Sequence, residues 1–165
     1  MTRQKKVTLI GGGVIGLSLA WELSQRGVDV TIIQRDTAEK TTSWTAGGIL
    51  PPANLARSLD PLDRLRGFSH ELYQDWVSRL ESVTQLDCGF RRCGGWYLAN
   101  TPGERASMIG MTTYWDELGI ACQATSLSDL AAQEPLLQPW INSHSSASAW
   151  WVADEWQIRP PHLLR

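Results

Sequence analysis

The sequence is poor in the residues that build metal sites, disulfide frameworks and membrane spans. It has three cysteines and three histidines, and the cysteines form no CxxC pair. Because the histidines also lack ligand-like spacing, we predict neither a disulfide framework nor a zinc site and expect no metal. No apolar run approaches the roughly 18 to 20 residues that a membrane-spanning helix needs. We therefore expect reduced thiols and no integral membrane contact.

Neither sign of charge is in large excess. The chain has 15 basic and 17 acidic residues, a formal net charge of −2, which gives no basis for nucleic acid as a partner. The hydrophobic share of 42% is typical of a globular domain. Basic residues before the apolar run 7–20 resemble the start of a signal peptide. Glycines interrupt that run, however, and Trp21-Glu22 follows where small residues should mark cleavage, so we expect a cytoplasmic protein.

What the sequence does contain is a strand–helix–strand pattern at its start. Residues 6–10 form a short, partly β-branched apolar segment, residues 14–25 have helical apolar spacing, and residues 28–33 (VDVTII) predict a second strand. Both strands are apolar enough to be buried on two faces, as in a parallel sheet with the helix as crossover. The sequence therefore predicts an α/β fold with a Rossmann-type βαβ unit.

Glycines join the first predicted strand to the helix with the spacing Gly11-x-Gly13-x-x-Gly16. The first allows a sharp turn, the second lets backbone approach a pyrophosphate, and the third lets the helix pack close to the strands. The N–H groups at the helix start, including those of Val14 and Ile15, suit phosphate. We predict that these five residues bind a dinucleotide.

The end of the second strand leaves the identity of the dinucleotide open. This fingerprint expects Asp or Glu about 20 residues on, as an acceptor for the ribose hydroxyls, and Gln34 occupies that position. Glutamine keeps one carbonyl acceptor but lacks the charge. Arg35 follows and suits a 2′-phosphate, so NADP remains an alternative to FAD at this point.

The next segment, residues 41–51 (TTSWTAGGILP), resembles the loop after the second strand in the D-amino acid oxidase superfamily, and most of all its glycine oxidase branch, the ThiO type of thiamine biosynthesis. Residues 89–95 (GFRRCGG), followed by WYLA, and residues 154–161 (DEWQIRPP) extend the resemblance through the chain. The resemblance implies FAD as cofactor. It assigns FAD binding to the hydroxyl-rich turn and the small residues after it: Thr41, Thr42, Ser43, Gly47, Gly48 and Ile49.

The resemblance also implies the wider architecture and the reaction. We expect the N-terminal portion of an FAD-dependent oxidase that converts glycine, sarcosine, or small D-amino acids or amines to the imine. Residues 1–85 would form the FAD-binding part, residues 86–153 an incomplete α+β substrate domain with a mixed or antiparallel sheet, and residues 154–165 a return towards the FAD domain. No catalytic residue is assigned, because the family's substrate-gripping arginine would lie beyond this chain, and the 165 residues alone are expected to be inactive. An NAD(P)-dependent oxidoreductase and a non-catalytic binding module remain alternatives, and the oligomeric state stays open.

The remaining elements are predicted from local signals. Asp60 is expected to cap a long helix from Pro61 to Val83, Thr101 begins a second helix with a capping box, and residues 90–99 suggest a β-hairpin around two glycines. Short strands near residues 121–124 and 147–153 flank a helix near 128–134. One face of the long helix is predicted to pack inward through apolar side chains at helical spacing: Leu62, Leu65, Leu72, Trp76, Leu80 and Val83.

Overall fold

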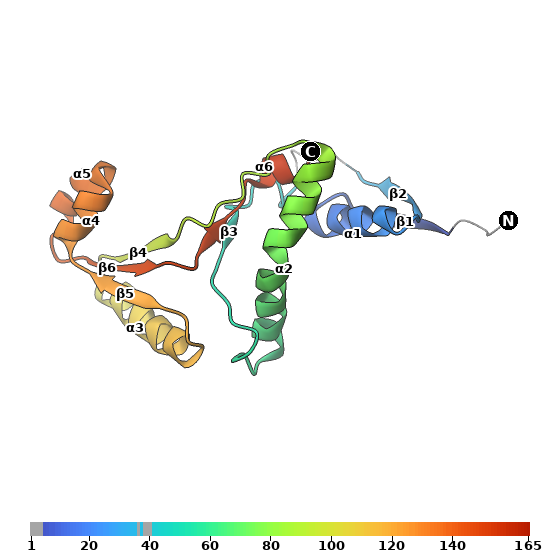
Figure 1. Ribbon diagram of the computed structural model, residues 1–165. Helices are drawn as coiled ribbons and strands as arrows, with labels where there is room; N and C mark the ends of the chain where they lie inside the picture. Colours follow the sequence, from blue (N-terminus) through green and yellow to red (C-terminus); the bar gives the residue numbers. More distant parts are fainter. Residues whose placement is uncertain (1–4, 36, 38–40) are drawn as a thin grey trace. The chain divides into compact units, whose positions relative to one another are not determined.

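The structure is a computed structural model that describes residues 5–35, 37 and 41–165. The chain divides into two compact units (Figure 1). The first unit comprises Met1–Gly48, Glu81–Phe90 and Ile158–Arg165, and the second comprises Ile49–Leu80 and Arg91–Gln157.

The βαβ pattern of the first unit is confirmed. Strand β1 (Lys6–Ile10) pairs in parallel with β2 (Asp29–Ile33), from Lys6 opposite Asp29 to Ile10 opposite Ile33. Helix α1 (Val14–Gln25) is the crossover between them, in blue in Figure 1. The helix ends where Gly27 takes a φ of 72°, a left-handed conformation that glycine adopts without steric cost.

The prediction that both strands are buried on two faces is wrong for the structure. Residues of β1 and β2 alternate between exposed and half-buried, and Ile10 and Ile33 are 90% and 55% exposed. The physical reason is that this two-stranded sheet is covered by a helix on one face only. In the described residues β1 and β2 pair only with each other, and one crossover helix covers only one face of such a sheet.

Helix α2 (Pro61–Thr84) begins as predicted but turns a different face inward. The Asp60 carboxylate accepts hydrogen bonds from the N–H groups of Leu62 and Asp63, which caps the helix. The buried residues of α2 are Gly67 and Val77.

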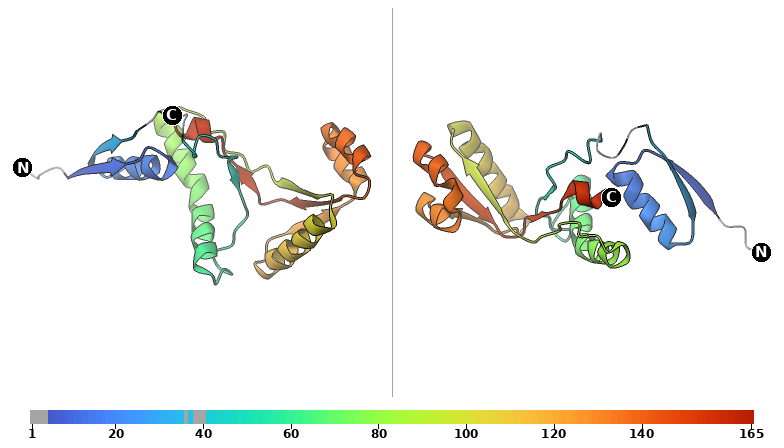
Figure 2. Two further views of the ribbon diagram at one scale, coloured as in Figure 1. Left: turned by 180° about the vertical axis from the view of Figure 1, so that it is seen from behind. Right: turned by 90° about the horizontal axis from the view of Figure 1, so that it is seen from above.

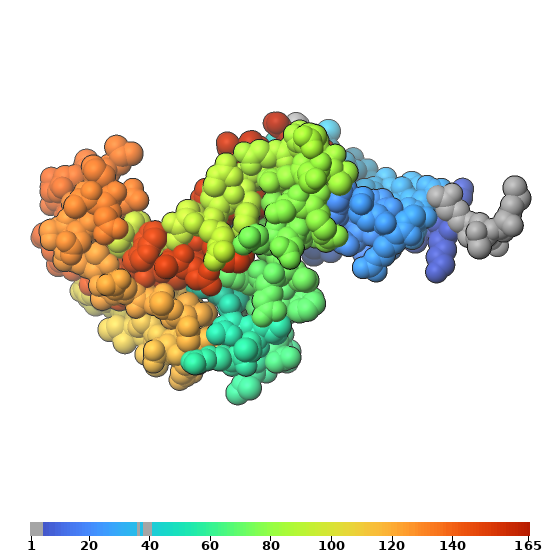
Figure 3. Space-filling model, viewed as in Figure 1, coloured from blue at the N-terminus to red at the C-terminus, as the bar shows by residue number. Residues whose placement is uncertain are grey.

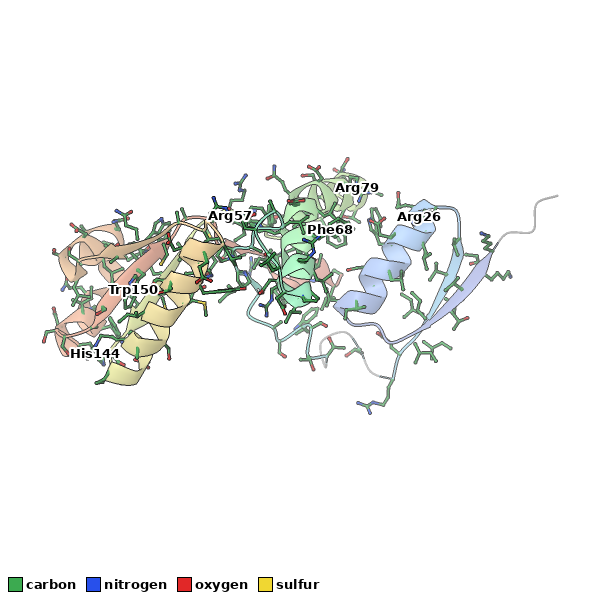
Figure 4. All side chains as sticks on the ribbon, turned by 90° about the horizontal axis from the view of Figure 1, so that it is seen from below. Arg26, Arg57, Phe68, Arg79, His144 and Trp150 are labelled. Carbon is green, nitrogen blue, oxygen red and sulfur yellow. The ribbon has the colours of Figure 1, made fainter. Side chains whose placement is uncertain are left out.

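The apolar stripe predicted to pack inward is largely exposed: Leu62, Leu65 and Leu72 are 56%, 62% and 51% exposed. Phe68, labelled in Figure 4, is 52% exposed as well. The helical phase was wrong because Gly67, which has no side chain, forms the close contact: a Cβ at Gly67 would lie 2.5 Å from the backbone N of Leu55. The spacing of apolar side chains does not reveal such a contact, because glycine contributes no side chain to the pattern.

The second unit contains a three-stranded antiparallel sheet of order β4–β6–β5. Its strands are β4 (Gly95–Ala99), β5 (Cys122–Thr125) and β6 (Ser148–Val152), with Trp96 opposite Trp151 across β4 and β6. The helices around it are α3 (Pro102–Glu117), α4 (Leu127–Gln133), α5 (Gln138–Ser143) and the 3-10 helix η2 (Pro135–Leu137).

Helices cover both faces of this sheet (Figure 2). Val152 packs with Trp115 of α3, whereas Ala149 packs with Leu130 of α4 and Ile141 of α5. Because Ala149 and Val152 are an odd number of positions apart on one strand, their side chains point to opposite faces. The core of the second unit is therefore divided between two layers.

The predicted hairpin over residues 90–99 is wrong. Gly95–Ala99 is a single strand whose partner is the distant β6, and Arg91 pairs with Gln157 in an isolated bridge. Gly94 and Gly95 serve close packing instead of a turn between adjacent strands. A Cβ at Gly94 would overlap the Trp151 ring, and one at Gly95 would overlap the Glu155 carboxylate.

The remaining elements are short. Strand β3 (Ile49–Leu50) pairs antiparallel with β7 (Trp156–Gln157), and α6 (Pro160–Leu163) follows. The capping box of α3 is confirmed: the Thr101 hydroxyl accepts from the Glu104 N–H, and the Glu104 carboxylate accepts from the Thr101 N–H. Over the described part of the chain, no helix is both long and apolar enough to cross a membrane.

Candidate cofactor site

A cavity of about 520 Å³ lies where β1 and β2 end. It brings the glycine turn together with the ends of both strands and with the hydroxyl-rich loop, segments that are separate in the sequence. In open α/β sheets, ligands bind outside the carboxyl ends of parallel strands, where this cavity lies. The lining residues are Ile10, Gly11, Gly12, Gly13, Ile33, Gln34, Arg35, Thr41, Thr42 and Ser43.

The turn has glycine where backbones approach closely. Gly11 has a φ of 110°, and its N–H donates to the carbonyl of Ile33 at 2.8 Å, which ties the turn to β2. A Cβ at Gly16 would overlap the Gly11 carbonyl oxygen, so the third glycine allows the helix to pack against the turn. The predicted site residues did not include Gly12, although a Cβ there would overlap the Gln34 side chain. The unbroken run of three glycines in the sequence could have pointed to this residue.

The start of α1 suits an anion. Its N-cap residue, Gly13, has no side chain to accept a hydrogen bond, and the first turn contains no acidic residue. The Val14 N–H instead donates to Ser43 Oγ at 3.0 Å. The positive end of the helix dipole is thus not offset by a carboxylate. The adjacent Ile15 side chain is 83% exposed.

The polar groups of the cavity come from β2 and from the loop. Gln34 presents an amide, and Thr41, Thr42 and Ser43 present hydroxyls. Among the residues of the lining that the structure describes, Arg35 alone carries a charge. The glycine turn, a helix start without an acidic residue and the Arg35 guanidinium together fit a pyrophosphate-containing dinucleotide.

Three predicted site residues, Gly47, Gly48 and Ile49, do not line this cavity. The Ile158 N–H donates to the Gly48 carbonyl at 2.8 Å, and Gly48 has a φ of 73°. A Cβ at Gly48 would overlap the Ile158 carbonyl oxygen. Ile49 opens β3 in the second unit and pairs with Gln157.

The sequence segments that carry the family resemblance contact one another. Gly48 packs against Ile158, and a Cβ at Gly89 would lie 2.5 Å from the Arg159 side chain. The Arg159 N–H also donates to the Cys88 carbonyl at 3.0 Å. Residues around 48, 89 and 158 therefore form one packed region of the first unit.

The part of the chain that the structure describes contains no cluster of three or more His, Cys, Asp or Glu placed to bind a metal ion. The cysteines Cys88, Cys93 and Cys122 are all free thiols. Burial raises the pKa of the Cys88 thiol, and the Glu81 and Asp87 carboxylates raise it further, so Cys88 is not an activated nucleophile.

Comparison with known proteins agrees with a dinucleotide site at the ends of β1 and β2. Residues 6–165 match the family described as FAD dependent oxidoreductase. The chain is 40% identical over 94 residues to the bifunctional protein ThiO/ThiG of Nostoc sp. (strain PCC 7120), which covers 57% of this chain and 14% of that protein. It is 32% identical to the D-amino-acid oxidase of Streptomyces coelicolor, over 92% of this chain and 47% of that one.

The fold matches solved structures over nearly its whole length. Against the crystal structure of glycine oxidase from Geobacillus kaustophilus, the TM-score is 0.81 at 28% identity, covering 99% of this chain and 43% of that one. The chain spans less than half the length of each of these three proteins.

Proposed function

The chain belongs to the family of FAD dependent oxidoreductases, and from this premise we propose that it supplies the FAD-binding part, and a portion of the substrate domain, of an oxidase acting on small amino acids or amines. Glycine, sarcosine and small D-amino acids are the proposed substrates. The observation that carries the proposal is the cavity that joins the Gly11–Gly13 turn, Gln34 and the Thr41–Ser43 loop.

FAD is the cofactor of this family, which favours it over the nicotinamide alternative. We propose that its pyrophosphate lies against the glycine turn and the first residues of α1, namely Gly11, Gly13, Val14, Ile15 and Gly16. The Gln34 carbonyl accepts from a ribose hydroxyl, and Arg35 and the hydroxyls of Thr41, Thr42 and Ser43 complete the phosphate side. Gly47, Gly48 and Ile49 are proposed to lie by the flavin ring, and the absence of a side chain at Gly48 lets this loop pack against the Ile158 backbone.

When bound, FAD supplies a ring that accepts electrons from the substrate. The chain's own contribution is to hold and orient the cofactor. We further propose that residues 1–85 belong mainly to the FAD-binding domain, residues 86–153 to the substrate domain, and residues 154–165 to a return towards the FAD-binding part. A cytoplasmic location is proposed on the basis of the three free thiols.

The decisive experiment is to purify the full protein that contains this chain and to identify its cofactor and substrates. We expect heat-released FAD, detected by flavin fluorescence, and hydrogen peroxide formation with glycine, sarcosine or D-alanine. NADPH binding without flavin would overturn the cofactor assignment. Stoichiometric FAD without turnover of any of these amines would favour a non-catalytic binding module.

The proposed role of Gln34 has its own test. Gln34→Glu should tighten FAD binding by roughly 1 kcal/mol, since hydrogen bonds to charged acceptors exceed neutral ones by about that much. Gln25→Glu, at the far end of α1, is the matched control and should leave the affinity unchanged. Fluorescence titration of the FAD-free protein measures both. Unchanged or weaker binding by Gln34→Glu would mean that another group holds the ribose.

A further inference from the structure

The second unit contains a cavity with aromatic walls, separate from the cofactor cradle. Its volume is about 380 Å³, and residues of α2, β4, α3 and the segment after β3 line it. Three aromatic side chains belong to the lining: Tyr97, Tyr114 and Trp115. An apolar cavity of about 150 Å³ can hold benzene, so this one has room for a small organic ligand.

Two of the rings meet almost at right angles. The Tyr97 and Trp115 rings have centroids 5.1 Å apart and an angle of 76° between their planes, so they form a corner instead of a stack. Trp115 is held in the core at 6% exposed, whereas Tyr114 is 38% exposed. An aromatic face carries partial negative charge, and cavities walled by several such rings bind methylated ammonium ions.

The hydroxyl groups of the lining have already donated their protons. The bonds run from Ser58 to the Asn54 carbonyl at 2.6 Å, from Tyr97 to the Glu155 carboxylate and from Tyr114 to the Asp63 carboxylate. These hydroxyls therefore keep only lone pairs for a ligand. Pro51 and Pro52, also in the lining, have no backbone N–H to offer. Such a lining suits an electropositive ligand better than an anion.

The uncompensated charge beside the cavity is negative. Arg66 and Asp63 of the lining offset each other, with Arg66 Nη1 2.9 Å from Asp63 Oδ1, and the Arg66 side chain is 61% exposed to water. Glu155, at the hydroxyl end of Tyr97, is 8% exposed and forms no ion pair among the described residues. A buried carboxylate without a cation favours a positive charge nearby.

We propose that this cavity binds a small methylated ammonium ion. Its methyl groups lie against the rings of Tyr97, Tyr114 and Trp115, and the Glu155 carboxylate supplies the opposite charge from the hydroxyl end of Tyr97. The inference goes beyond the proposed oxidase function and does not rest on it, because binding of such an ion needs neither flavin nor an oxidisable amine.

The test is calorimetric titration of the full, FAD-loaded protein with choline and with dimethylbutanol, its neutral isostere, in which carbon replaces the nitrogen. Neither compound has an amine lone pair, so amine oxidation does not disturb the measurement. We expect saturable choline binding and about tenfold weaker binding of dimethylbutanol. No saturable binding of choline, or equal affinity for the two compounds, would overturn the proposal.

Paired variants locate the site. Met111→Lys places a positive charge in the lining at a 43% exposed position and should weaken choline binding about tenfold. Ile109→Lys, on the same helix and 62% exposed but outside the lining, is the control and should leave the affinity unchanged.

The ring itself is tested at Tyr114, which is exposed enough to be replaced without disturbing the core. Tyr114→Leu should weaken choline binding about fivefold, whereas Tyr114→Phe keeps the ring and should weaken it less. Circular dichroism verifies that each variant is folded. Choline binding that is unchanged in both Met111→Lys and Tyr114→Leu lies elsewhere and would refute the assignment.

Discussion

Two polar side chains in the second unit, the buried Glu155 and the half-buried Tyr97, depend on each other. Glu155 is 8% exposed, and its carboxylate accepts a hydrogen bond from the Tyr97 hydroxyl. Burial, and then the hydrogen bond to Glu155, raise the pKa of Tyr97 well above its usual range, so the phenol stays protonated as a donor. Gly95 makes room for this carboxylate, since a Cβ there would overlap it.

Removing the hydroxyl should therefore leave a buried carboxylate without its donor. We predict that Tyr97→Phe destabilises the protein by about 1–3 kcal/mol, measured by urea unfolding. Tyr114→Phe is the matched control, because its hydroxyl also donates to a carboxylate, Asp63, but at an exposed position. We expect a clearly smaller loss there. Equal losses in the free energy of unfolding for the two variants would show that burial does not determine how much the Tyr97 hydrogen bond contributes to stability.

His70 should give the stability a pH dependence of known sign. Burial lowers its pKa from the ordinary 6.5, and Arg92 adds to this, whereas Asp154 and Glu71 act in the opposite direction. Below about pH 6.5 the unfolded chain takes up a proton that the folded chain resists. Stability is thus present above that pH and falls as pH decreases.

The check is a series of urea unfolding midpoints between pH 7.5 and 5.5. We expect the acid loss to be smaller in His70→Gln, which has no titrating group at this position. An unchanged slope in that variant would assign the acid loss to other groups.

At the level of elements, the segment that joins the cofactor loop to β3 depends on one glycine. Gly48 has a φ of 73° and lies against the Ile158 carbonyl and the Pro160 ring. We predict that Gly48→Ala destabilises by at least about 1–2 kcal/mol, because the left-handed conformation alone costs that much for a residue with a Cβ.

Its neighbour Gly47 is the control: a Cβ there would meet nothing within 4 Å. Gly47→Ala should be close to neutral in thermal unfolding. If both alanine variants are equally stable, the Gly48–Ile158 contact is not a constraint on this loop.

Elements with local signals were predictable from sequence, and those set by distant partners were not. Thr101 and Glu104 are three residues apart and cap each other, so the start of α3 follows from a short stretch. Gly94 lies under Trp151, more than fifty positions away, and no local pattern distinguishes that contact from a turn. The same holds for the face of α2, where the contact between Gly67 and the Leu55 backbone determines the orientation.

In the candidate site too, features with a local sequence signal were predictable and those that depend on distant residues were not. The Gly11–Gly13 turn has a local motif and was predictable, whereas the packing of Gln34 over Gly12 depends on the pairing of β1 with β2. The bond from the Val14 N–H to Ser43 spans 29 positions and has no local signal. The resemblance to a family selected the Thr41–Ser43 loop, which the residues alone left open.

For the molecule as a whole, several large apolar side chains are exposed on β1, β2 and α2. Ile10 and Ile33 are opposite each other in the register of β1 and β2, so their exposed side chains are neighbours. Figure 3 shows α2, in green, at the surface, and its Leu65, Phe68 and Leu72 are each more than half exposed. Contiguous apolar patches mark surfaces that bind other protein or lead to aggregation.

This exposure predicts that the isolated 165-residue chain binds hydrophobic dyes and self-associates, because β1 and β2 offer apolar side chains beside unpaired backbone groups. The double variant Ile10→Thr, Ile33→Thr keeps β-branched residues and should reduce both properties while β1 still pairs with β2. Leu136→Thr is the control. Leu136 is 93% exposed but lies in the short η2 segment, and a lone exposed leucine is normal on a protein surface. Dye fluorescence and analytical ultracentrifugation measure the two effects. A monomeric chain that binds no dye would mean that these side chains are covered in solution, and an equal effect of Leu136→Thr would mean that the paired isoleucines are not the cause.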